Sequence, residues 1–272
     1  MKAPENYQEL TDVLRGRLPK LASGQLRVAH LVLADPEGTA YRGISEAARI
    51  AEVHESSITR LANSLGLQGY PAIMELCRVW LAEQAHRARR TEETAHESPG
   101  GVLSAALEQE QENLARTFGR LDRSSWLRAV ALLAETQQVH VLGLRESAPV
   151  ADLLARRLRN ARRLMEPVAE LPGVAEGDVF VAVSVRRYAA DTVRAVEYVR
   201  DRGNPVVALT DNAASPLVEY AEAALFAETV GVGGFHSLTA LAALAQALGQ
   251  EVALRRGDHD EDDLPKALGF YF

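Results

Sequence analysis

Small polar residues follow several apolar runs of this 272-residue chain, where each run gives way to helical sequence. Gly143 closes the run 139–143, Ser147 precedes the next helical stretch, and Ser184 ends the run 178–184. Thr210 and Ser215 flank a third such joint. A hydroxyl beside a helix N-terminus offers hydrogen bonds to an anion, and the helix dipole adds attraction. These positions predict an anion-binding edge.

Three arginines lie beside these hydroxyl groups in the sequence: Arg145, Arg186 and Arg187. Guanidinium groups bind carboxylate or phosphate bidentately. We therefore expect a pocket for a small anionic metabolite, held by arginine side chains as much as by backbone amides. In the alternative interpretation, Arg186 and Arg187 point to solvent or form a subunit interface.

A glycine-rich loop at 231–237 carries His236, which could act as a hydrogen-bond donor or proton shuttle. The loop could equally be a flexible connector in which Ser237 caps the following helix. No histidine pair has the spacing of metal ligands, so we expect neither a metal nor a cofactor.

Near the N-terminus, the segment 44–62 has the spacing of a helix-turn-helix. Ala48 is small where two helices would cross, and apolar residues such as Ile58 and Leu61 would be buried between them. A turn at 52–54 joins the helices, with Glu52 where many such motifs have glycine, and 55–57 could cap the second helix. The residues predicted to reach DNA are short, polar or cationic: Arg42, Arg49, Ser56, Ser57, Thr59, Arg60 and Asn63. The alternative is an ordinary helical hairpin with a polar face.

The elements that must position these residues change character along the chain. Helical periodicity runs to about residue 85, broken at Asp35–Gly38 among other places, and a polar stretch follows at 86–101. Beyond it, near-continuous apolar runs alternate with helical sequence, which predicts a doubly wound parallel α/β sheet with ligands at its carboxyl edge. We therefore expect an all-α helix-turn-helix domain at 1–85, a linker at 86–101 and an α/β domain at 102–272.

Charge and composition constrain the function further. The net charge of −7 argues against a chain that coats nucleic acid along its whole length, but residues 1–90 carry net +2. The single cysteine, Cys77, excludes an intramolecular disulfide and is expected to be a core residue. We expect a cytoplasmic protein, because the sequence shows no apolar signal region and no apolar stretch of the roughly 18 residues that span a membrane.

Two motifs and their order resemble the RpiR family of bacterial transcriptional regulators. One is Gly143-Leu144-Arg145-Glu146-Ser147 together with Ala182-Val183-Ser184, and the other is the stretch from Ser56 to Tyr70. The resemblance implies an N-terminal helix-turn-helix and a C-terminal SIS (sugar isomerase) domain, a flavodoxin-like five-stranded parallel sheet that senses phosphorylated sugars or related metabolites.

The chain departs from the family pattern Ser-x-Ser-Gly-x-Thr at residues 184–189. Arg186, Arg187 and Ala189 replace the second Ser, the Gly and the Thr, and Arg145 stands where Gly is common. Tyr188 resembles the aromatic residue that a subgroup of these regulators has at this position, and this resemblance leaves ligands other than phosphosugars open.

Two functions remain open from the sequence. The first is a regulator that binds operator DNA as a homodimer or homotetramer and responds to a small anionic effector. The second is a SIS-type sugar-phosphate isomerase, or a non-catalytic sugar-phosphate-binding protein. Isomerisation needs a positioned base, and only Glu146, Glu228 and His236 are candidates. The helix-turn-helix favours the regulator.

Overall fold

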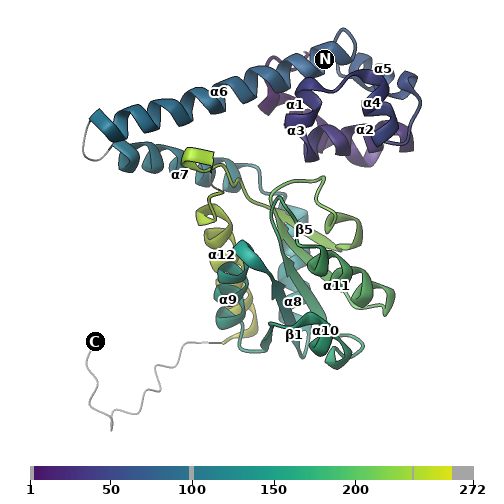
Figure 1. Cartoon of the computed structure of the whole chain (residues 1–272). Coiled ribbons are helices and arrows are strands. Elements are labelled where there is room, and N and C mark those ends of the chain that lie inside the picture. The colour runs from purple at the N-terminus through teal and green to yellow at the C-terminus, as the bar shows by residue number, and fades with distance from the viewer. Residues whose placement is uncertain (1–2, 98–100, 235, 259–272) are drawn as a thin grey trace.

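The computed structural model describes residues 3–97, 101–234 and 236–258, and arranges them as a helical head and an α/β body (Figure 1). We use "head" for helices α1 to α6 and "body" for the rest. The helices of the head are α1 (Tyr7–Arg17), α2 (Ser23–Ala34), α3 (Pro36–Tyr41), α4 (Ile44–Ile50), α5 (Glu55–Ser64) and α6 (Tyr70–Glu97).

Helix α3 occupies the place where the sequence indicated a break. The carboxylate of Asp35 accepts a 2.8 Å hydrogen bond from the backbone N–H of Gly38, and Pro36 takes the first helical position. A capping aspartate followed by proline starts a helix as readily as it ends the preceding one. The sequence therefore indicates the end of α2 correctly, but it does not reveal that helix α3 begins at the same place.

Two other helix starts also differ from expectation. The imidazole of His54, not residues 55–57, caps α5 by accepting from the backbone N–H of Ser56. Asp122 caps α8 (Arg123–Glu135), where the two following serines were candidates. In both cases the cap lies one or more residues upstream of the hydroxyl groups that suggested it.

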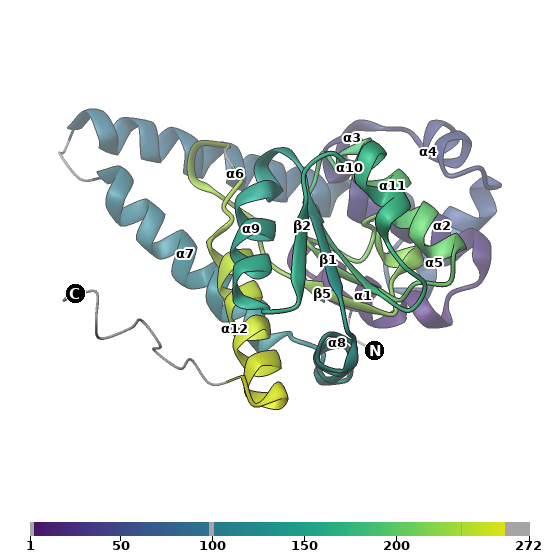
Figure 2. The same cartoon turned by 90° about the horizontal axis from the view of Figure 1, so that it is seen from below.

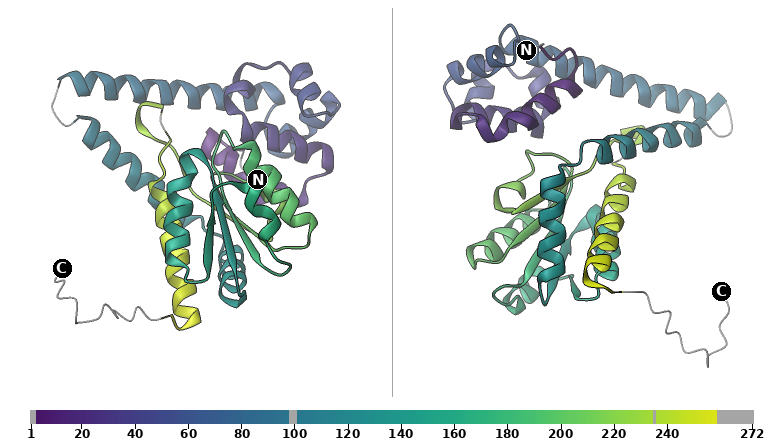
Figure 3. Two further views of the ribbon diagram at one scale, coloured as in Figure 1. Left: turned by 60° about the horizontal axis from the view of Figure 1, so that its bottom comes forward. Right: turned by 180° about the vertical axis from the view of Figure 1, so that it is seen from behind.

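The segment 86–101, expected as a linker, is helical as far as Glu97. Helix α6 begins among the other helices of the head and extends beyond them. Helix α7 (Gly101–Gly119) returns toward the body, so the two helices form a projecting hairpin (Figures 1 and 3). The segment does connect head and body, but through a long helix. The division of the chain into domains at this point stays a prediction.

The body contains five parallel strands in the order β2-β1-β3-β4-β5 (Figure 2). The strands are β1 (Val139–Gly143), β2 (Ala161–Leu164), β3 (Val179–Val183), β4 (Val206–Thr210) and β5 (Ala223–Phe226). The remaining helices are α9 (Ala148–Arg157), α10 (Pro167–Glu170), α11 (Ala190–Asp201) and α12 (Thr239–Arg256). The expected helix at 216–222 is only a 3₁₀ turn, Val218–Tyr220.

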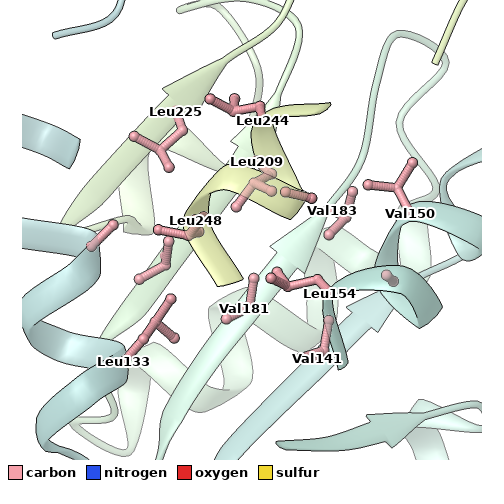
Figure 4. Close-up of a cluster of buried hydrophobic side chains, with 14 of the residues drawn as sticks. Leu133, Val141, Val150, Leu154, Val181, Val183, Leu209, Leu225, Leu244 and Leu248 are labelled. Carbon is pink, nitrogen blue, oxygen red and sulfur yellow. The ribbon is translucent and has the colours of Figure 1, made fainter. Parts of the chain in front are cut away.

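Two apolar layers sandwich the sheet, which confirms the doubly wound α/β class. On one face, residues such as Val141, Val181 and Leu209 pack against α8, α9 and α12 (Figure 4). On the other, Leu142 and Phe180 lie against α11. The strands β1, β3 and β4 are buried on both faces, which is why they read as continuous apolar runs. The acidic run at 257–263 falls mostly outside the described residues.

The head has its own core, which contains Cys77. Its thiol is buried, as expected, among residues of α1, α2, α5 and α6 such as Leu10, Leu14 and Ile73. Burial raises the pKa of the Cys77 thiol to about 12, with a smaller contribution from Asp35.

The thiol of Cys77 should therefore be inert in the folded chain. At pH 8 the raised pKa keeps it protonated, and the thiolate is the reactive form. Treatment with a chromogenic disulfide reagent should release less than about a tenth of the signal obtained in denaturant, because only unfolding restores an ordinary pKa. Full reaction within minutes in native buffer would contradict the buried placement.

Candidate functional site

Helices α4 and α5 form the predicted helix-turn-helix. Ala48, Ile58 and Leu61 are buried between the helices of the head, as their spacing indicated. The turn contains Glu52 at φ +52°, in the left-handed region that favours glycine. Thus the turn keeps the backbone conformation that glycine adopts in such motifs while a larger side chain occupies the position.

Arg27 of α2 holds this turn, a role that the sequence analysis missed. Its guanidinium donates two 3.0 Å hydrogen bonds, one to the carbonyl oxygen of Ala51 and one to that of Glu52. These carbonyls follow the end of α4 and lack helical partners. Only the packing of α2 across the turn brings Arg27 there, so no local pattern could have revealed it.

The predicted DNA-contacting residues divide into two groups. Arg49, Thr59, Arg60 and Asn63 are exposed, as expected of a face that reads DNA. Ser56 is half-buried, and its hydroxyl accepts a 3.0 Å hydrogen bond from the guanidinium of Arg60.

The second group, Ser57 and Arg42, has contacts within the head. A Cβ built at Gly24 of α2 would lie 3.1 Å from the Ser57 hydroxyl, so that side chain faces α2. Arg42 pairs with Asp35 at 2.7 Å, and its side chain is only 16% exposed. For these two residues the structure indicates a packing role, whereas contact with DNA stays a prediction for the others.

In the body, the carboxyl ends of β1 and β3 meet at the point where the strand order reverses. Ligands bind at this position in open parallel sheets. Ser147 and Ser184 are buried beside it, and neither hydroxyl has a hydrogen-bond partner in the described ranges. A Cβ at Gly143 would come within 2.8 Å of the Ala151 Cβ, so only glycine fits between β1 and α9. We call Gly143, Ser147 and Ser184 the serine edge.

Arg145 and Arg187 flank the serine edge and are exposed. Both adopt positive φ angles, +53° and +65°. Arg186 is different, because it is half-buried and turns toward the head. The sequence grouped the three arginines together, but the structure separates Arg186 from the other two.

Tyr188, Thr210 and Ser215 join a hydrogen-bonded cluster around Asp211, which sequence reasoning missed. The Tyr188 hydroxyl donates to the Asp211 carboxylate at 2.8 Å, and the backbone N–H of Arg186 donates to it at 3.1 Å. Burial and the Asp211 charge raise the pKa of Tyr188, which stays protonated as the donor. The Thr210 hydroxyl donates to the Ser184 carbonyl at 2.7 Å. These predicted ligand-binding groups already have partners in the chain.

The same junction ties the body to helix α1 of the head. Arg15 donates a 3.3 Å hydrogen bond to the Asp211 carbonyl and lies 3.6 Å from the Glu228 carboxylate. Arg120 bridges Glu228 at 3.0 Å and Asp12 of α1 at 2.7 Å. The contact is therefore an ionic cluster in which charges of opposite sign alternate.

A cavity of about 280 Å³, which we call the head–body cavity, lies between α1, α3 and α6 of the head and the end of β4 in the body. Tyr7, Arg15, Arg186 and Asp211 are among its lining residues. His236 also lines it and is exposed, so of the ten predicted ligand-binding residues this cavity contains only Arg186 and His236.

Comparison with known proteins identifies both parts of the chain. Residues 8–84 match the helix-turn-helix domain of the rpiR family, and residues 132–249 match the SIS domain. The sugar isomerase domain of an RpiR transcription factor from Sphaerobacter thermophilus is 31% identical, with a TM-score of 0.56, over 58% of this chain and 92% of that one. This chain belongs to the RpiR family of transcription factors.

Other matches extend over most of the chain. The HTH-type transcriptional regulator HexR of Pseudomonas aeruginosa is 28% identical over 226 residues, which cover 77% of this chain and 75% of HexR. The structure of Vibrio vulnificus NanR complexed with ManNAc-6P has a TM-score of 0.56 and 21% identity, and covers 92% of this chain and 93% of NanR. That likeness shows a shared fold of head and body.

Two arginines beside the serine edge have a backbone conformation that favours glycine. Arg145 and Arg187 both adopt a positive φ, in the left-handed region that glycine adopts without strain. At both positions the sequence differs from the family pattern to which it is similar by replacing glycine with arginine.

Two further classes of site are absent from the part of the chain that the structure describes. Residues 3–97, 101–234 and 236–258 contain no cluster of three His, Cys, Asp or Glu side chains that could hold a metal ion. None of the helices in these ranges has the length and hydropathy needed to cross a bilayer.

Replacing Glu52 by glycine should stabilise the head. Glycine removes the strain of the left-handed conformation, and we expect a gain of about 0.5–1 kcal/mol in the free energy of unfolding. Glu46→Gly is the matched control, because Glu46 is exposed in helix α4 and should lose about 1 kcal/mol. Urea denaturation followed by circular dichroism measures both, and a Glu52→Gly variant less stable than wild type would contradict the interpretation.

Proposed function

We propose that this RpiR-family chain binds operator DNA through the exposed face of α5, and that a small anionic metabolite at the serine edge alters that binding. The observation that carries the proposal is the pairing of an exposed polar helix, on a head of regulator type, with two unpartnered serine hydroxyls at the strand-order reversal. We further propose that the chain acts in the cytoplasm as a homodimer, because two heads add their phosphate contacts.

The proposed ligand is a phosphorylated sugar or a related anion. NanR, which shares the fold, is described as complexed with ManNAc-6P, and this supports the ligand class. The chain's own support is chemical: at the serine edge, buried hydroxyls lie beside the N-terminus of α9, and Arg145 and Arg187 lie exposed nearby.

An isomerase is the weaker alternative. Of the three candidate bases, Glu228 is held by ion pairs with Arg15 and Arg120, while Glu146 and His236 are exposed. A general base must be positioned beside the substrate, and none of the three is held in place at the serine edge by a side-chain contact within the described residues.

Arg60→Ala should weaken operator binding by about tenfold, because it removes an exposed cation from the recognition face. The slope of log affinity against log salt should fall by about one unit. Fluorescence anisotropy with DNA from upstream of the gene, measured at several salt concentrations, tests both values.

Arg194→Ala is the control for Arg60→Ala, because Arg194 lies on α11 of the body with its side chain 76% exposed. This variant should bind DNA as wild type does. Equal affinity of Arg60→Ala and wild type would contradict the placement of the recognition helix.

Ser147→Ala and Ser184→Ala should each lower the affinity for the effector by about tenfold, because each loses a hydrogen bond to a charged group. Thermal-shift screening of hexose and amino-sugar phosphates, followed by calorimetry, provides the measurement. Ser104→Ala, at an exposed position of α7, controls for loss of a hydroxyl elsewhere. Unchanged effector affinity in both Ser147→Ala and Ser184→Ala would show that the effector does not bind at the serine edge.

A further inference from the structure

Two donors in the head–body cavity lack partners. Arg186 makes no ion pair within the described residues, although its guanidinium lies close enough to influence the pKa of both Tyr7 and Asp35. Tyr7 is only 8% exposed, and its hydroxyl has no hydrogen-bond partner in the same ranges. Burial raises the pKa of Tyr7, so the phenol remains a donor at neutral pH.

A third donor, the Arg15 side chain, also lines the head–body cavity. The Nε atom of Arg15 is buried without a partner, although its other nitrogens contact Asp211 and Glu228. Arg15 also influences the pKa of Tyr7. Leaving the buried Nε–H of Arg15 unsatisfied is costly, and a common explanation is a ligand or water that the protein is built to hold.

The carboxylates that line the cavity differ between its interior and its rim. The inner carboxylates are engaged: Glu228 pairs with two arginines, and Asp211 accepts from Tyr188 and from the backbone of Arg186. Glu37 and Glu83, by contrast, are exposed at the rim. An anion therefore finds free donors inside, whereas an ammonium or hydroxyl group finds carboxylates outside.

A larger cavity of about 650 Å³ shares Arg15, Asp211 and Glu228 with the head–body cavity but differs in the rest of its lining. Among its lining residues, Asp12 and Arg120 pair with each other, and Asp122 caps α8. Neither Arg186 nor Tyr7 lines it. Because Arg15 lines both cavities, only Arg186 and the Tyr7 hydroxyl distinguish the smaller one.

We propose that the head–body cavity is a second ligand site, separate from the serine edge, for a small molecule with a phosphate or carboxylate at one end and ammonium or hydroxyl groups at the other. Arg186, Tyr7 and Arg15 bind the anionic end, and Glu37 and Glu83 face the other end. Neither serine of the edge lines this cavity. Because Tyr7 belongs to the head and Arg186 to the body, the ligand contacts both.

Calorimetric titration of the full chain with glucosamine 6-phosphate tests the site. Wild type should show a site whose affinity falls about tenfold in Arg186→Gln, because a charged bidentate donor is lost. Tyr7→Phe should weaken the same site by about threefold while the melting temperature stays unchanged, since the hydroxyl has no partner to lose. Arg194→Gln is the matched control, because Arg194 is an exposed arginine of α11 that does not line the cavity, and it should bind as wild type does.

The outcomes separate this site from the proposed effector site. Binding that responds to Arg186→Gln and Tyr7→Phe but not to Ser184→Ala supports the cavity. Binding that responds only to Ser184→Ala overturns the cavity and leaves the proposed function standing. If wild type does not bind glucosamine 6-phosphate, the cavity is not a site for this class of ligand, while the DNA-binding experiment still decides the regulator.

Discussion

The attachment of the head to the sheet depends on Asp211, the first residue after β4. Its carboxylate organises the loop after β3 through Tyr188 and the backbone of Arg186, and its carbonyl accepts a hydrogen bond from Arg15 of α1. Hydrogen bonds to charged groups contribute about 1.5–3 kcal/mol each. A single residue at the end of a buried strand therefore holds the loop after β3 on one side and a helix of the head on the other.

The ionic cluster beside Asp211 makes this attachment polar, which affects how readily it rearranges. Arg120 and Arg15 share Glu228, and the Asp12–Arg120 pair crosses from head to body. Partly exposed ion pairs contribute little individually and are weakened by salt. The two apolar layers of the body and the core of the head, in contrast, consist of buried side chains, although Ala214 of the body packs against the head core. Head and body are thus each more firmly packed than the contact between them.

The sequence predicted those features that arise from local pattern. Continuous apolar runs located β1, β3 and β4, and the spacing of Ala48, Ile58 and Leu61 located the helix-turn-helix. Features that depend on contacts between distant segments were not predictable. Arg27 reaches the turn only because α2 packs across it, and Arg186 differs from Arg187 only because the head covers one side of the loop. The capping role of Asp35 was readable locally, but Pro36 and Gly38 were taken as a break.

The length of helix α6 sets the direction in which the head faces. Its backbone is helical over 28 residues, which corresponds to a rod of about 42 Å. A helix transmits rotation as well as length, and each residue adds about 100° of turn. The rotational phase of the head about this rod is therefore encoded in the residue count of α6. Exposed side chains along the rod can vary without changing this phase, whereas Tyr70, Ile73 and Cys77 are buried in the head. A single inserted or deleted residue would turn the face of α5 away from its original direction.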